Sequence, residues 1–402
     1  MAGTRSRPNT EAVRARRRFR AFAEAVIEPR AAAMDRAGEV SADVIEALVA
    51  DGHLGATVGA AHGGGGLDMV TVGILHEEVG RACSSVRSLL TVHGMVCVAI
   101  ERWGTAAQRA DWLPRLARGE VIGALGLTED GAGSDAGAIE TTATPGAGGH
   151  VVTGRKRWIT AARVAGVVLL LARTGGGISA FLVPRDVAGL TVVPVDDVLG
   201  TRASLLGDLH LDACRLPEGA LLGPLDMGLA TAGATALEFG RNSVACGCVG
   251  IAQACLDACL AHTGSRRQGG AYLKDHQLVR RLLTDMVTNV AAARLLCRQA
   301  GELRDAGDPG GVLATWMAKY FASGIASRAA SDAVQIHGAS GCAGDHVASR
   351  CFRDAKVMEI IEGATEIQQL MIADLARSQA GALPSWSDGL PRMGSISGGV
   401  RP

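Results

Sequence analysis

The sequence predicts an α+β fold in which a helical domain, a small β domain and a helical bundle follow one another. Apolar residues recur at helical spacing before about residue 121 and again after about residue 224, and polar and apolar residues alternate between these stretches. The 402 residues also exceed what one hydrophobic core usually organises. We therefore expect domains at 11–121, 122–223 and 224–380, followed by a disordered tail at 381–402 that is rich in Gly, Ser and Pro.

The first domain is predicted from two helical stretches separated by a glycine run. Residues 11–33 are rich in Ala, Glu and Arg and carry apolar side chains at helical spacing. The arginines at 16–18 are interpreted as a solvated helix face. The glycines within 62–66 indicate a loop, and a second helix pair is predicted over 69–117.

The middle domain is predicted from short strand-like runs that Gly, Pro and Asp separate. We place these strands at 150–158, 166–172, 179–183, 190–195 and 205–211. The links are too short for crossover helices, so the sheet is expected to be antiparallel.

The third domain is predicted from long apolar-periodic segments with short links. These segments cover residues 225–263, 275–306, 312–336 and 364–380. Long helices joined by short loops favour a four-helix bundle.

Composition limits the class of protein. Lys plus Arg equals Asp plus Glu at 40 each, so no net field favours nucleic acid or an anionic membrane. No apolar run reaches the roughly 18 residues of a membrane span, and the N-terminal stretch lacks the apolar segment of a secretory signal. The ten cysteines are expected to be buried free thiols in a reducing cytoplasm. We expect a cytoplasmic protein.

The first candidate site is the glycine-rich loop at 126–135, where the helical and β parts meet. Its glycines allow a ligand to approach the backbone, and Thr128 and Ser134 add hydroxyl groups suited to phosphate or a polar ring edge. A simple connector is the alternative. The loop lacks the GxGxxG pattern and the strand–turn–helix context of a Rossmann site.

Two further segments are candidates. In residues 154–161, Trp158 and Thr160 offer a flat ring and a hydroxyl to an aromatic cofactor, with a buried core tryptophan as the alternative. In residues 360–367, Glu362 follows two isoleucines, which would desolvate its carboxylate and raise its pKa towards that of a useful base. Capping of the next helix is the alternative for Glu362.

Taken together and in this order, these segments resemble the acyl-CoA dehydrogenase family over roughly residues 14–375. The resemblance rests on the runs GALGLTEDGAGSD, GRKRWITAA, LEFGRNSVACGCVGIAQACLDA, QIHGASG and RCFRDAKVMEIIEGATEIQ.

The resemblance implies FAD as the cofactor and Glu362 as the base that removes the α-proton of an acyl thioester while a hydride passes to the flavin. It further implies that Arg241 and Gly363 bind the substrate side, and that the substrate is carried on CoA or on an acyl carrier protein (ACP). The cofactor-binding residues it implies are Leu127, Thr128, Gly133, Ser134, Trp158, Thr160, Thr365 and Glu366, together with Arg266, Gln268, Gln335 and Gly338. The last four would reach the FAD of a neighbouring subunit, so a homodimer or homotetramer is expected.

The chain departs from the family pattern at several positions. Gly269 stands where a phenylalanine beside the neighbouring flavin is usual, which would weaken FAD retention. Ala339, Ala364 and Ile361 replace a common glycine, threonine and tyrosine. Some members carry the base just before the arginine that corresponds to Arg241, but that position here is Gly240.

A narrower resemblance is to the ACP-linked dehydrogenases of hydroxymalonyl- and methoxymalonyl-ACP synthesis in polyketide pathways. It is visible in SSVRSLLTVHGM, GRNSVACGCVGI and GDHVASRCFRDAKVMEIIEG. It implies that Arg87, Ser88 and Thr91 lie near the closed end of the acyl pocket, where Arg87 would pair with a product carboxylate. An exposed helical arginine is the alternative for Arg87.

Other functions remain open on the sequence alone. The runner-up is a short-chain α,β-dehydrogenase of CoA thioesters, and a third hypothesis is a flavin-dependent monooxygenase or nitroalkane oxidase. A helical scaffold that has lost its flavin is the non-enzymatic alternative. The expected electron acceptor is an electron-transfer flavoprotein or oxygen.

Overall fold

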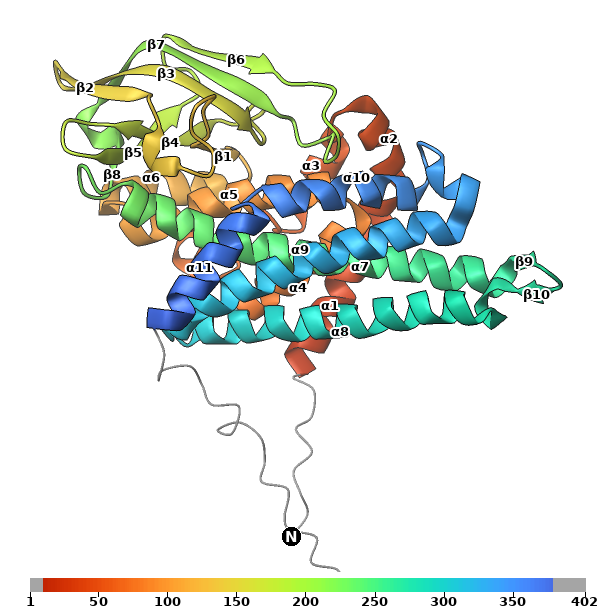
Figure 1. The fold of residues 1–402 in the computed structure, drawn as a ribbon. Coiled ribbons are helices and arrows are strands. Elements are labelled where there is room, and N and C mark those ends of the chain that lie inside the picture. The colour runs from red at the N-terminus through yellow and green to blue at the C-terminus, as the bar shows by residue number, and fades with distance from the viewer. Residues whose placement is uncertain (1–9, 379–402) are drawn as a thin grey trace, which may run out of the picture.

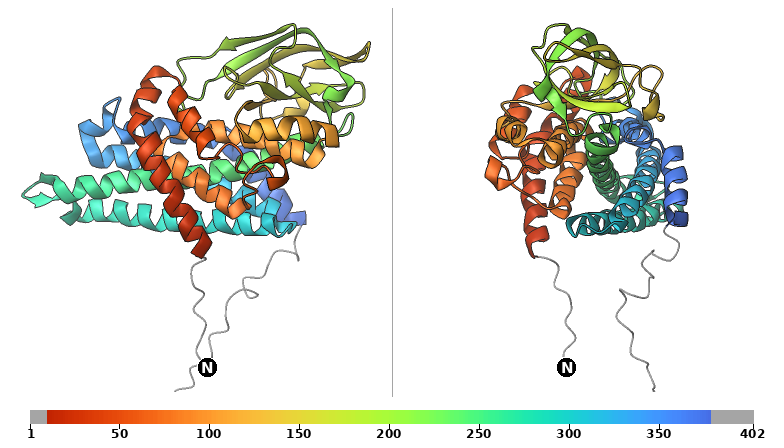
Figure 2. Two further views of the ribbon diagram at one scale, coloured as in Figure 1. Left: turned by 180° about the vertical axis from the view of Figure 1, so that it is seen from behind. Right: turned by 90° about the vertical axis from the view of Figure 1, so that its left-hand side faces the viewer.

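The structure is a computed structural model that describes residues 10–378. A β-sheet domain lies against one end of two groups of helices, one from each half of the chain (Figures 1 and 2). This order of helices, sheet and helices confirms the predicted fold class. The tail predicted to be disordered, 381–402, lies outside the described residues.

The N-terminal domain contains more helices than the sequence predicts. The expected helix over 11–33 is interrupted because Pro29 lacks an N–H donor, and the chain passes through a π turn and a 3₁₀ turn. The expected pair over 69–117 is three helices, since Cys83 and Gly104 are extended. The elements are α1 (Thr10–Phe22), η1 (Ala23–Ile27), η2 (Glu28–Arg30), α2 (Ala31–Ala37), α3 (Ala42–Ala50), η3 (Ala60–His62), α4 (Met69–Ala82), α5 (Ser84–Trp103) and α6 (Ala106–Ala117).

The middle domain is a mixed sheet of eight strands in the order β6-β7-β3-β2-β4-β5-β8, with β1 paired to β4. Most pairings are antiparallel as expected, but β1 and β2 run parallel to β4. The strands are β1 (Gly123–Gly126), β2 (Thr142–Gly146), β3 (Gly149–Ile159), β4 (Val167–Arg173), β5 (Ile178–Pro184), β6 (Leu190–Pro194), β7 (Gly207–Pro217) and β8 (Leu221–Leu222), with short η4 (Ala136–Ala138) and η5 (Glu218–Ala220). The five predicted strands correspond to β3–β7. Strands β1 and β8 were missed because they are short, and β2 because its sequence, TATPG, has few apolar residues and contains Pro and Gly.

The C-terminal helices form a bundle around α7, with one helix more than predicted. Helix α10 was missed because its sequence is rich in charged residues. The elements are η6 (Leu229–Gly233), α7 (Ala234–Ser265), β9 (Arg267–Gln268), β10 (Ala271–Tyr272), η7 (Leu273–Asp275), α8 (Gln277–Asp305), α9 (Gly310–His337), η8 (Gly338–Cys342), α10 (Val347–Ile360) and α11 (Thr365–Ser378). Figure 1 shows α7, α8 and α9 side by side along much of their length.

Helix α7 corrects one compositional prediction. The segment Leu229–Ser265 is long and apolar enough to cross a membrane, although no such segment was expected. Its most apolar window is 72% buried inside the protein, and neighbouring helices account for this composition. The cysteines match the expectation, since all ten are free and nine are buried.

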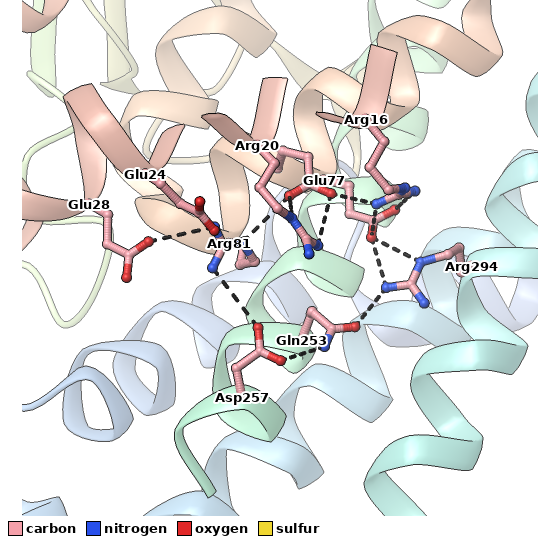
Figure 3. Close-up of polar contacts among 10 residues, drawn as sticks. Arg16, Arg20, Glu24, Glu28, Glu77, Arg81, Gln253, Asp257 and Arg294 are labelled. Carbon is pink, nitrogen blue, oxygen red and sulfur yellow. Dashed lines mark hydrogen bonds and ion pairs between the residues drawn. The ribbon is translucent and has the colours of Figure 1, made fainter. Parts of the chain in front are cut away.

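Helix α1 docks on α4 through two adjacent carboxylates of α4, Glu77 and Glu78. Figure 3 shows Glu77 between Arg16 and Arg294. Glu78 is fully buried and pairs with Arg16 at 2.6 Å and Arg20 at 3.0 Å. Glu77 pairs with Arg16 at 2.7 Å and with Arg294 of α8 at 2.8 Å. The interpretation of arginines 16–18 as a solvated face is therefore wrong for Arg16.

Replacing Glu78 with glutamine is expected to lower the free energy of unfolding by about 3 kcal/mol, because it removes the charge of a fully buried carboxylate that pairs with the part-buried Arg16 and Arg20. Chemical denaturation measures this change, with Glu120→Gln as the control. Glu120 pairs with Arg118 at 2.6 Å on the surface, where solvent screens the charges and the pair contributes little to stability. Equal losses in the two variants would contradict a structural role for the buried pair.

Candidate active site

Glu362 lies in the short turn between α10 and α11 and has an unusual backbone conformation. Its φ is +56°, and Gly363 follows with φ +89°. A glutamate in the left-handed region costs about 1–2 kcal/mol, and such strain is concentrated at functional sites. The carbonyl oxygens of the turn are held by two buried side chains. The amide of Gln368 donates to the oxygens of Glu362 and Gly363 at 3.0 and 3.1 Å, and Lys319 Nζ donates to Gly363 O at 2.6 Å.

The carboxylate of Glu362 points into the protein and does not cap α11. Its Oε2 atom is buried and has no hydrogen-bond partner among the described residues. Burial raises the pKa of Glu362 to about 7, although the cations Arg241, Lys319 and Arg87 act in the opposite direction. The capping alternative is therefore wrong, and the side chain has the protonation behaviour of a base that works near neutral pH.

Gly240 of α7 faces this carboxylate directly. A Cβ atom placed at Gly240 would lie 2.6 Å from Cδ of Glu362. The two sequence positions that can carry a base in the resembled family therefore converge on one place in space. The glycine at 240 leaves that place to Glu362.

Replacing Gly240 with alanine is expected to displace the carboxylate and slow the reaction by about 10- to 100-fold, since a shift near 1 Å at a reacting group has this cost. Anaerobic flavin reduction measures the rate. Gly264→Ala in the same helix is the matched control, because a Cβ at Gly264 meets no atom within 4 Å. A Gly240→Ala enzyme as fast as the control would show that the contact does not matter.

Arg241 lies beside this carboxylate and stacks on a tryptophan. Its Cζ atom is 4.0 Å from the ring centroid of Trp316, and its buried Nε atom has no hydrogen-bond partner within residues 10–378. Burial lowers the pKa of Arg241, while the charge of Glu362 raises it. Arg241 is thus held in place with an unused donor near the predicted base.

Arg87 of α5 is fully buried, so the exposed-arginine alternative is wrong. Its guanidinium donates to Thr91 Oγ1 at 3.0 Å and to Ser88 Oγ at 2.9 Å. Its Nε atom is buried and has no hydrogen-bond partner in the part of the chain that the structure describes. Gly247 makes the necessary space, since a Cβ there would lie 2.8 Å from Arg87 Cδ. Thr91 also contacts Ser243 Oγ at 2.6 Å. The three residues predicted to line the acyl pocket therefore form one buried polar cluster whose cation interacts with Glu362.

The predicted flavin loop is anchored at its base and open at its tip. Lys156 of β3 is fully buried and donates to Glu129 Oε1 at 2.5 Å and to the carbonyl of Leu127 at 3.0 Å. Glu129 also accepts from the backbone N–H groups of residues 140 and 141. Gly131 and Gly133 have free space beside them, and Ser134 is exposed. Thr128 is half-buried, and its carbonyl accepts from the backbone N–H of residue 157 at 2.8 Å.

Trp158, at the end of β3, is not a core residue. Its side chain is 51% exposed, its φ is +59°, and the Arg157 guanidinium lies 5.0 Å from its ring centroid. Thr160 follows it and is half-buried. A large aromatic ring held in a strained conformation and left open is typical of a platform for a flat ligand.

The remaining predicted cofactor residues lie in two places. Arg266 and Gln268 are exposed around the β9–β10 hairpin, and Gln335 and Gly338 are exposed where α9 ends. Stacking of His262 on His337, with ring centroids 4.4 Å apart, joins these two segments at the outer end of the bundle. Figures 1 and 2 place this end far from the β domain. Thr365 and Glu366 instead begin α11, next to Glu362.

Gly269 has a structural role of its own. It has φ +57° and Gly270 has φ +81°, so the two form the tight turn of the β9–β10 hairpin. Two-residue hairpin turns of this kind require positive φ at both positions, which favours glycine.

The sequence analysis missed four buried polar residues: Glu129, Lys156, Lys319 and Gln368. A lysine within an otherwise apolar helical segment was the one signal that could have found Lys319.

The comparisons with known proteins agree with these motifs. The N-terminal, middle and C-terminal domains of acyl-CoA dehydrogenase match residues 9–120, 124–214 and 226–376. The chain belongs to the acyl-CoA dehydrogenase family. It is 37% identical to the mouse mitochondrial short-chain specific acyl-CoA dehydrogenase, over 89% of this chain and 88% of that protein.

Two solved structures add detail. One is FkbI for biosynthesis of the methoxymalonyl extender unit of the polyketide FK520, with 39% identity, a TM-score of 0.84 and coverage of 89% of this chain and 99% of that one. The other is a glutaryl-CoA dehydrogenase from Mycobacterium smegmatis in complex with FADH2, with 28% identity, a TM-score of 0.87 and coverage of 93% and 96%.

The cofactor of this acyl-CoA dehydrogenase is FAD. The residues of this chain fit it, because the open glycine tip of the loop suits phosphate and the exposed Trp158 ring suits a flat ring system. When bound, FAD supplies the two-electron acceptor for a hydride from the acyl group. The protein provides the buried carboxylate of Glu362, which is the predicted base, and the buried polar cluster around Arg87.

Proposed function

We propose that this dehydrogenase oxidises a short polar acyl group, held as a thioester on an acyl carrier protein, during synthesis of a polyketide extender unit. The observation that carries the proposal is Arg87. It is fully buried, yet none of its hydrogen-bond partners among the described residues is a carboxylate. A buried charge costs several kcal/mol unless it is paired, so an anionic group of the substrate or product is the expected partner.

The proposed reaction uses two buried charged side chains, Glu362 and Arg87. The preferred substrate is a carrier-bound glyceryl-type unit whose C3 is an aldehyde, present as its hydrate. Glu362 takes the proton of one hydrate hydroxyl, the hydride leaves C3, and the carbon becomes a carboxylic acid. The product ionises and its carboxylate meets Arg87, with Ser88 and Thr91 as further hydrogen-bond partners.

The likeness to FkbI supports a role in the synthesis of a polyketide extender unit. The burial of Arg87 also favours a second candidate substrate. Arg87 would also pair with an acyl group that already ends in a carboxylate, such as glutaryl-CoA. The butyryl group of an ordinary short-chain substrate would leave Arg87 without a partner.

We also propose that a second copy of this chain completes the cofactor site. Arg266 and Gln268 are exposed at the hairpin and lie far from the loop at 127–134, so one chain cannot use both at one FAD. We propose a homodimer or homotetramer in the cytoplasm, with an electron-transfer flavoprotein as acceptor. The exposure of Arg266 and Gln268 supports the oligomer.

Anaerobic bleaching of the purified FAD-loaded protein tests the proposal, with glyceryl-ACP, its C3 aldehyde, glutaryl-CoA and butyryl-CoA in parallel. We expect the carrier-bound aldehyde to bleach the flavin and mass spectrometry to show a new carboxylate. Bleaching by butyryl-CoA alone, with an enoyl product, would reduce the function to α,β-desaturation of CoA thioesters. Bleaching by glutaryl-CoA alone would establish the second candidate.

A further inference from the structure

We propose that Lys319 and Gln368 are positioning residues that hold the Glu362 turn in its strained conformation, and that Lys319 also tunes the charge of Glu362. This inference rests on Glu362 being the base of the proposed reaction. Both side chains are fully buried, and both donate hydrogen bonds to carbonyl oxygens of the turn. Each therefore acts on the backbone of the turn.

The hydrogen bonds explain how the turn is held. The side-chain amide of Gln368 reaches two carbonyl oxygens, those of Glu362 and Gly363, so the atom facing them must be its nitrogen. Lys319 Nζ adds a bond of 2.6 Å to the second of these oxygens. Charged donors make hydrogen bonds roughly twice as strong as neutral ones. These three bonds offset the cost of left-handed φ at Glu362 and keep its side chain directed at Gly240.

The charges explain the tuning. Lys319 of α9 interacts with Glu362, with Arg241 and Cys248 of α7, and with Glu359 of α10. Glu362 itself faces three cations, which are Arg241, Lys319 and Arg87. Burial lowers the pKa of Lys319 to about 8, so it is still cationic at neutral pH. Lys319 Nζ is fixed 2.6 Å from the carbonyl oxygen of Gly363, the residue that follows Glu362. A cation held this close to the turn favours the ionised carboxylate, which is the form that acts as a base.

The test separates the two contributions. Protein labelled with ¹³C at glutamate carboxyls is titrated by NMR, and a Glu362→Gln sample identifies the resonance of Glu362. In Lys319→Met we expect its titration midpoint to rise by about one unit, the usual effect of losing a close opposite charge. Lys319→Arg should restore the midpoint. The control Lys356→Met removes an exposed lysine and should leave it unchanged.

Gln368→Met provides the second readout, since it removes two backbone bonds and no charge. We expect an unchanged midpoint but a kcat that falls at every pH by about 10-fold or more, as for a misplaced base. The inference is wrong if Lys319→Met titrates like the wild type, or if Gln368→Met reduces its flavin at the wild-type rate. A different result would show that Glu362 is not the base: the Glu362→Gln enzyme would still bleach its flavin when substrate is added.

Discussion

Replacing Glu362 with glutamine is expected to slow anaerobic flavin reduction by about 10³-fold while FAD stays bound. A positioned general base contributes about 10²- to 10⁴-fold. The three atoms nearest to a Cβ built at Gly240 all belong to the carboxyl group of Glu362. Because the pKa of Glu362 is raised to about 7, kcat/KM of the wild type should fall as the pH drops below 7.

Although it slows the reaction, Glu362→Gln should make the folded protein more stable, by an amount that depends on the pH. Burial raises the pKa of Glu362, so its neutral form is favoured in the folded protein, and stability is lost as the pH rises from about 4.5 to about 7. Glutamine stays neutral, so the variant should melt above the wild type at pH 8.5 and close to it at pH 4.5. A variant that keeps full activity, or that melts below the wild type at pH 8.5, would rule out a buried base at this position.

Replacing Arg87 with methionine is expected to reduce kcat/KM for the carrier-bound polar acyl group by about 10²-fold or more. Removal of one partner from a buried charged contact costs 2–5 kcal/mol. The rate with butyryl-CoA should change much less, because that acyl group has no charge for Arg87 to meet.

Arg87→Met should also stabilise the protein without substrate, by about 1 kcal/mol, since methionine relieves an unpaired buried charge in a site of similar volume. Thermal melting measures this gain. The control is Arg102→Met, because Arg102 lies at the exposed end of the same helix and should change neither property. If Arg87→Met lost stability and treated all acyl groups alike, Arg87 would be a packing residue and the polar-substrate proposal would fail.

Local pattern was enough for much of the fold. The long apolar helices α7, α8 and α9 and the strands β3–β7 repeat their period over several residues, so each could be predicted from its own segment. Short or atypical elements could not. The four-residue β1 and the charged helix α10 give no clear period, and Pro29 divides a stretch that composition alone makes continuous.

Some features of the candidate site could likewise be predicted from the sequence, and others could not. The identity of Glu362 as a candidate base follows from its neighbours in the sequence, because adjacent isoleucines and a following glycine predict desolvation and a turn. The alternatives for Arg87 and Trp158 could not be decided there, since exposure depends on what packs around a residue. The structure decided them in opposite directions, with a buried arginine and an exposed tryptophan.

By itself, the sequence determined the succession of helices, strands and helices, the family motifs, and the residue types that bring acid–base and cofactor chemistry. These are properties of contiguous segments, in which period and composition act over a few residues. The tertiary structure alone decided that Gly240, Lys319 and Gln368, from three different helices, meet at Glu362. A pKa and a strained turn depend on burial and on partners distant in the chain, and only packing brings these together.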